Sequence, residues 1–182
     1  METDMEKKKI FNELGKRGTE GILNGNTTNL REWNRIKYDW ANVMYRTMLN
    51  NFWIEDIKQF SYLTAGERKA FDKIISFLNF LDSIQCENLP NLARYITAAE
   101  VASLLNVQAF QEEIHAQSYS YILDTVTNPV TRDKIYDEWR EDPILLRRNK
   151  FIADMYQRFA DDPSTENFVR SVMANYILEG IY

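Results

Sequence analysis

The sequence is poor in cysteine, histidine, glycine and proline. Its 182 residues include one cysteine, one histidine, six glycines and four prolines. A single cysteine, Cys86, excludes an internal disulfide and suits a reducing compartment, so we expect a cytoplasmic protein. The scarcity of glycine and proline, the two strongest helix breakers, favours a mostly helical chain.

Long apolar runs and basic clusters are also missing. No hydrophobic stretch approaches the roughly 18 residues that a membrane-spanning helix needs. Residues 1–9 are charged and lack the apolar segment of a signal peptide. The net charge is −5, and acidic and basic residues are interspersed. We therefore expect neither a membrane nor a nucleic acid as a partner.

The remaining composition is sufficient for one domain with a sizeable core, because 45% of the residues are hydrophobic. Residues 1–29 are polar and contain several turn formers, which predicts an N-terminal arm lying over the surface. Residues 30–182 are expected to form one all-α domain. Helices are predicted over residues 31–52, 64–86, 97–125, 128–139 and 142–159, and from residue 164 onward.

Local signals mark several of these helix ends. Residues 64–67 and 97–100 both read Thr-x-x-Glu, which is the spacing of a capping box. Pro143 stands at a first helical position, where its missing N–H costs nothing. Pro90 predicts a break in the chain after the second helix.

The only histidine lies in a distinctive pattern. His115 follows Glu112 by three residues and precedes Tyr119 by four. On an α-helix these three side chains fall within about 60° of one another, on a face that is otherwise apolar. Burying an unpaired charge is costly, so a compensating group is expected. A Glu-x-x-His pair facing the inside of a helix bundle is the ligand pair of di-metal carboxylate proteins.

Two other predicted helices each carry an acid in apolar surroundings, Asp82 and Glu179. Carboxylate oxygens with an imidazole suit iron or manganese. A di-metal site in a four-helix bundle needs one acid from each of two helices and a Glu-x-x-His pair from each of the other two. Asp82 and Glu179 fill the single-acid positions, and Glu112 with His115 forms one pair. The second pair is absent from the sequence.

Over residues 25–182 the sequence resembles the small, radical-generating subunit of class I ribonucleotide reductase. The stretches that carry this resemblance occur in unbroken order, and they are Lys37–Ala41, Asn50–Ile54, Leu81–Gln85, Phe110–Tyr119 and Tyr176–Tyr182. The resemblance implies a ferritin-like helical bundle. It also implies a part in the reduction of ribonucleotides to deoxyribonucleotides, as a component of a ribonucleoside-diphosphate reductase.

The resemblance further implies the metal ligands of a dinuclear centre, which would be Fe2, Mn/Fe or Mn2. Asp82, Glu112 and His115 would bind one metal, with Glu112 bridging, and Glu179 would bind the second.

Redox and supporting roles are implied as well. Tyr119 occupies the position of the family's stable tyrosyl radical, and Trp53 that of a tryptophan on the radical-transfer path. Gln108 occupies a position next to the ligand that corresponds to Glu179.

The sequence departs from the family pattern by lacking the helix with the second acid and histidine, and the C-terminal tail that docks the large subunit. We therefore expect an incomplete bundle, the N-terminal half of a split or truncated subunit. Its expected partners are a complementary chain that supplies the missing acid and histidine, the large catalytic subunit, and a second copy of the completed subunit.

Two other functions remain open at this point. A homodimer could bring two Glu112/His115 pairs together and form a different di-metal oxidase. Alternatively, the chain could be a non-catalytic remnant that binds the large subunit or an intact small subunit.

Overall fold

The computed structural model describes residues 5–15, 21–50 and 63–181. Within these ranges the regular structure is all-helical apart from isolated bridge residues, which include the antiparallel pair Leu23 and Ile96. The prediction of an all-α fold is therefore confirmed. The helices are α1 (Asp39–Asn50), α2 (Ala65–Ala93), α3 (Ala99–Val126), α4 (Pro129–Glu141), α5 (Pro143–Asp161) and α6 (Thr165–Ile181). None of these helices is both long and apolar enough to cross a lipid bilayer.

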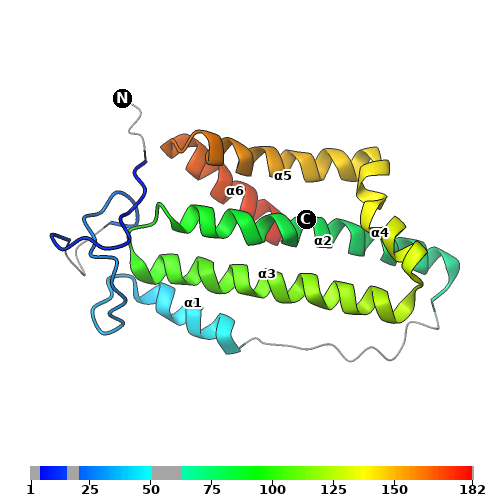
Figure 1. The fold of residues 1–182 in the computed structure, drawn as a ribbon, viewed down its shortest axis with the longest axis horizontal. Coiled ribbons are helices and arrows are strands. Elements are labelled where there is room, and N and C mark those ends of the chain that lie inside the picture. The colour runs from blue at the N-terminus through cyan, green and yellow to red at the C-terminus, as the bar shows by residue number, and fades with distance from the viewer. Residues whose placement is uncertain (1–4, 16–20, 51–62, 182) are drawn as a thin grey trace.

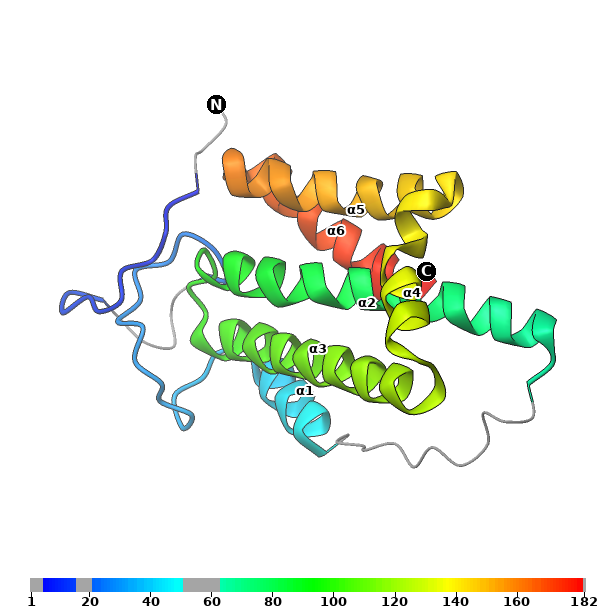
Figure 2. The same cartoon turned by 45° about the vertical axis from the view of Figure 1, so that its right-hand side comes forward.

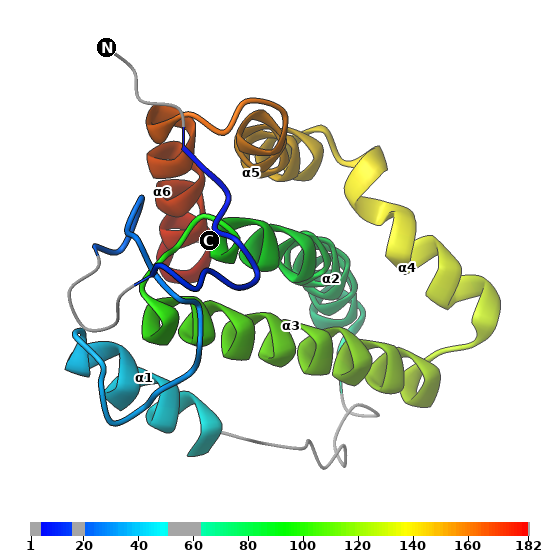
Figure 3. The same ribbon diagram turned by 60° about the vertical axis from the view of Figure 1, so that its left-hand side comes forward.

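Two long helices, α2 and α3, run side by side and form the centre of the molecule (Figure 1). Helix α1 packs on α3, and α4 crosses at one end to connect α3 with α5 (Figure 2). Helices α5 and α6 pack on each other and cover α2, while the N-terminal arm wraps the opposite end (Figure 3). This arrangement brings α2, α3 and α6 together near the middle of the molecule.

Side-chain caps fix several helix starts. Thr64 and Glu67 form the predicted capping box, with Glu67 Oε2 accepting from Thr64 N at 2.8 Å. Asn128 accepts a hydrogen bond from Thr131 N at 3.0 Å at the start of α4. Asp142 Oδ1 accepts from the first amides of α5, and its other oxygen pairs with Lys73 at 2.6 Å. The capping box at Thr64 and the starts of α4 and α5 therefore agree with the predictions from the sequence.

Helix α2 does not end near Cys86 as predicted, because it continues through Pro90 to Ala93. A proline inside a helix costs about 3 kcal/mol. The last turns of α2 carry Leu89 and Leu92, which are 0% and 1% exposed, and each buried leucine stabilises the fold by about 1.5–3 kcal/mol. The free energy gained by burying these leucines therefore outweighs the cost of a proline inside the helix.

The capping box predicted at Thr97 is also wrong. Helix α3 begins after Ala98, which makes no side-chain cap. The Thr97 hydroxyl instead contacts the arm, where it donates to Gly21 O at 2.8 Å and accepts from Gly25 N at 2.9 Å. Tertiary contacts to the arm have replaced the local cap.

The first helix is shorter than predicted, since the described helix begins at Asp39 rather than near residue 31. Glu100 explains this start. Its Oε1 accepts from the backbone amides of Lys37 and Tyr38, each at 3.0 Å, and so holds the chain in an open turn just before α1.

Three buried clusters hold the helices together. The first joins the arm, the ends of α2 and α5, and the starts of α1, α3 and α6. It includes Met5, so the arm contributes to the core rather than only covering it. The second lies between α2, α5 and α6, and includes Leu81 and Tyr156. The third lies between α2, α3 and α4, with Tyr119 packed against it.

Candidate metal centre

Asp82, Glu112 and His115 converge between α2 and α3. Each offers one ligand atom, and these atoms all lie within 4.8 Å of one another. His115 Nδ1 lies 3.1 Å from Glu112 Oε2 and 3.5 Å from Asp82 Oδ2. Asp82 and Glu112 are 6% and 4% exposed, whereas His115 is partly exposed. The i, i+3 spacing on α3 and the antiparallel approach of α2 are sufficient to create this cluster.

Charge and burial oppose one another in this cluster. The neighbouring carboxylates, Asp82 first and then Glu112, raise the pKa of His115 to about 10. Burial raises the pKa of Glu112 above its ordinary value, although the hydrogen bond to His115 acts in the other direction. Two buried carboxylates therefore require a positive charge beside them, and the protonated imidazole supplies one.

These residues fit a divalent cation. Asp82 Oδ2 is buried and, apart from His115 Nδ1 at 3.5 Å, has no hydrogen-bond partner among the residues that the structure describes. Two carboxylates and an imidazole are the hard and borderline donors that iron and manganese accept. A cation bound by them would provide the compensating charge that the imidazole proton otherwise gives.

Glu179 approaches the same region from α6. Its Oε1 accepts hydrogen bonds from Gln108 Nε2 on α3 and Gln85 Nε2 on α2, both at 3.0 Å. The Glu179 charge also contributes to the raised pKa of Glu112. Glu179 is itself exposed and lies outside the three-residue cluster. The structure thus brings the four predicted ligands to one part of the molecule, and the ligand atoms of three of them lie within 4.8 Å of one another.

The predicted redox residues are less well defined by the structure. Tyr119 lies one turn beyond His115 on α3, half-buried against the cluster of Ile75, Leu123 and Ile135. Trp53 lies outside the described residues, so its predicted place on a radical-transfer path stays a prediction.

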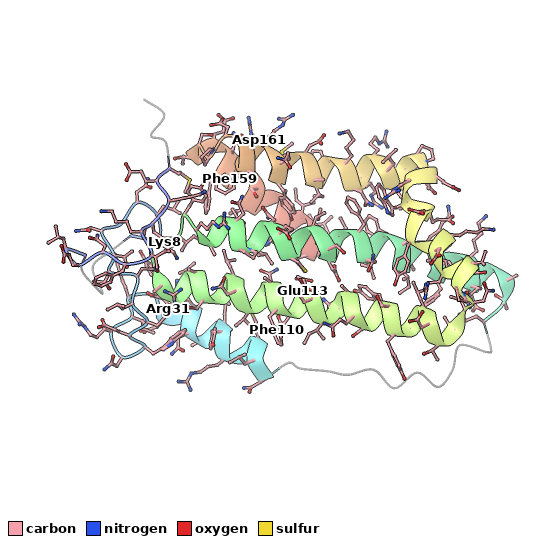
Figure 4. The ribbon with its side chains drawn as sticks, in the orientation of Figure 1. Lys8, Arg31, Phe110, Glu113, Phe159 and Asp161 are labelled. Atoms are coloured by element: carbon pink, nitrogen blue, oxygen red, sulfur yellow. The ribbon has the colours of Figure 1, made fainter. Side chains whose placement is uncertain are left out.

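Three residues near the ligands on α2 and α3, namely Cys86, Phe110 and Glu113, are not expected to bind a metal. Glu113 and Phe110 lie in the middle of α3 and are exposed (Figure 4). Burial and a hydrogen bond with Glu113 contribute to raising the pKa of the Cys86 thiol to about 12, with burial the larger cause. Cys86 is therefore protonated at neutral pH, as expected for an unreactive thiol.

Sequence reasoning missed Gln85, which contacts Glu179 although it lies on another helix. A signal was available, because Gln85 follows Asp82 by three residues and so shares its helix face. The sequence could not show that α6 would reach that face.

Comparison with known proteins identifies the family. Residues 30–182 match the family described as "Ribonucleotide reductase, small chain". The chain belongs to the ribonucleotide reductase small-chain family. The ribonucleoside-diphosphate reductase subunit beta of Treponema pallidum is 47% identical to it over 99% of this chain, which corresponds to 54% of that protein.

Solved structures of this family share the fold. The ribonucleotide reductase R2 subunit from Clostridium botulinum is 74% identical, with a TM-score of 0.92 over 99% of this chain and 59% of that one. A dimanganese(II)-NrdF of Streptococcus sanguinis, at 22% identity, has a TM-score of 0.70 over 82% of this chain, a likeness of fold alone. The predicted ferritin-like architecture is thus confirmed. The chain spans about half the length of its Treponema pallidum relative.

Proposed function

We propose that this chain provides the N-terminal half of a class I ribonucleoside-diphosphate reductase small subunit, which forms and stores the radical used to reduce ribonucleotides. The observation that carries this proposal is the convergence of Asp82, Glu112 and His115 inside the segment that matches the family. No packing requirement explains two buried carboxylates beside the only histidine, whereas a metal site does.

Each of the four ligands has a proposed task. Asp82, Glu112 and His115 would hold one ion, and Glu179 would hold the second, with Glu112 shared between them. When bound, a pair of iron or manganese ions would supply the oxidising power to remove an electron and a proton from a tyrosine. His115 must release its proton before Nδ1 can act as a ligand.

Tyr119 is the proposed radical site. It follows His115 by one helical turn and packs among apolar side chains of α2, α3 and α4. Apolar neighbours on this side of the ring would help to protect an oxidised phenol from reduction.

The rest of the centre is proposed to come from a segment that this sequence does not contain. In relatives of about twice this length, that segment would supply a further acid and histidine. Helix α6 supports this idea because it carries large apolar side chains that are 40–70% exposed, namely Val169, Val172, Met173, Tyr176 and Ile181. Such a stripe indicates a surface that another element covers. We also propose dimerisation of the completed subunit and association with the large subunit.

The experiment combines this chain with its complementary half, adds Fe(II) and oxygen or Mn(II) and a suitable oxidant, and records electron paramagnetic resonance spectra. A tyrosyl radical signal is expected. Tyr119→Phe should abolish it, whereas Tyr121→Phe, which changes a 62% exposed tyrosine on the same helix, should leave it unchanged. Persistence of the same signal in Tyr119→Phe would contradict the assignment.

Two further measurements separate the two other functions. Tight binding of two metals per dimer by this chain alone would indicate a homodimeric di-metal oxidase. Unchanged reductase activity in cells that lack the chain would indicate a non-catalytic remnant.

A further inference from the structure

Glu179 is held by side chains rather than by the packing of its own helix. Helix α6 packs mainly on α5 and only lightly on α2. Glu179 is in the last turns of α6 and is exposed. An exposed glutamate normally samples several rotamers, because ordering a long side chain is entropically costly. The hydrogen bonds to α2 and α3 therefore have to determine where this carboxylate points.

Gln85 is the buried member of this network. It is 0% exposed, and its Nε2 donates both to Glu179 Oε1 at 3.0 Å and to Asn175 Oδ1. Asn175 lies one helical turn before Glu179, so a single amide contacts two successive turns of α6. Gln108, by contrast, is half-buried and reaches Glu179 from the solvent side.

Gln85 keeps this arrangement at a cost to stability. Its Oε1 is buried without a hydrogen-bond partner among the described residues. An unsatisfied buried polar atom costs about 1–3 kcal/mol. An apolar side chain of similar length would avoid that cost, so packing alone does not explain a glutamine here.

The two carboxylate oxygens of Glu179 differ in their hydrogen bonds. Oε1 accepts from both amides, whereas no hydrogen bond to Oε2 occurs within the described part of the chain. A ligating carboxylate commonly has one oxygen held by hydrogen bonds while the other faces the metal. Gln85 also follows Asp82 by three residues, so one face of α2 presents a ligand and the group that holds another.

We propose that Gln85 is a positioning residue, whose amide fixes the Glu179 carboxylate toward the cluster of Asp82, Glu112 and His115. This proposal rests on the proposed metal centre. According to this proposal, Gln85 does not contact a metal, and it affects metal binding only by orienting Glu179.

The test measures Mn(II) binding by the full chain combined with its complementary half, using Gln85→Met. Methionine has a similar length and no buried polar atom, so the variant should fold. The affinity for the Mn(II) ion whose binding depends on Glu179 should fall about 10–100-fold. This is the range typical for residues that orient metal ligands. Gln157→Met, which alters an exposed glutamine on α5, is the matched control and should bind as the wild type does.

A double-mutant cycle separates positioning from a general structural role. In a Glu179→Gln background, adding Gln85→Met should change the affinity less than twofold. An equally large loss in both backgrounds, or wild-type affinity in Gln85→Met, would overturn the proposal.

A measurement without metal tests Gln85 even if the proposed centre fails. The side-chain amide resonances of Gln85 and Gln108 should both shift in Glu179→Gln, since both amides donate to that carboxylate. An unchanged Gln85 resonance would overturn the positioning role. Absence of any Mn(II) binding by the wild type combined with its complementary half, with the shift present, would overturn the metal centre alone.

Discussion

Nδ1 of His115 on α3 lies 3.5 Å from Oδ2 of Asp82 on α2, while the same nitrogen lies 3.1 Å from Glu112 on its own helix. One nitrogen therefore faces two carboxylates from two helices. A proton on this nitrogen and a metal ion bound there exclude each other, and this competition gives the centre a defined dependence on pH.

Metal binding should release protons. The pKa of His115 is raised to about 10 by Asp82 and Glu112, so the imidazole is protonated at pH 7 when no metal is bound. Between pH 7 and 9 the apparent affinity for Mn(II) should rise about tenfold for each pH unit and each proton released. Calorimetric titrations in buffers of different ionisation enthalpy measure this proton count. A pH-independent affinity would contradict the assignment of His115 Nδ1 as a ligand.

Glu100 should stabilise the fold through the segment before α1. It is 3% exposed, and its Oε1 accepts from the amides of Lys37 and Tyr38. Glu100→Ala should lower the free energy of unfolding by about 2–4 kcal/mol, because two hydrogen bonds to a charged acceptor are lost. Urea unfolding measures the difference. Glu87→Ala, at an exposed position of α2, should stay within about 0.5 kcal/mol of the wild type. A similarly small effect of Glu100→Ala would show that these contacts contribute little.

The folded chain should be more stable with the substitution Tyr156→Phe. Its hydroxyl is buried without a hydrogen-bond partner in the described part of the chain, and burial, then Glu179 and Glu112, raise its pKa well above the ordinary value. Removing the hydroxyl should increase the free energy of unfolding by about 1 kcal/mol. Thermal unfolding of the metal-free chain checks this result.

The matched control for Tyr156→Phe is Tyr136→Phe. The Tyr136 hydroxyl donates to Ser120 Oγ at 3.0 Å, so its loss should destabilise the chain by about 0.5–1.5 kcal/mol. The two variants should therefore differ in sign. Equal destabilisation by both would indicate that Tyr156 also has a hydrogen-bond partner.

Local rules made much of the fold predictable. The starts of α2, α4 and α5 follow from caps that act within three residues, and all three helices begin where the sequence indicates. The same rules failed where distant parts of the chain compete. Thr97 and Glu100 have the spacing of a capping box, yet both bind segments more than 60 positions away. Pro90 is tolerated because the leucines on either side of it are buried.

The amino-acid sequence by itself determined that the chain is helical and that Glu112 and His115 share one helix face, because helical periodicity fixes which neighbours align. Only the tertiary structure decided that Asp82 lies opposite that pair, and that Gln85 meets Glu179, 94 positions later in the chain. The physical reason is that such contacts depend on how α2, α3 and α6 pack against one another, and packing is a property of the whole chain rather than of any local segment.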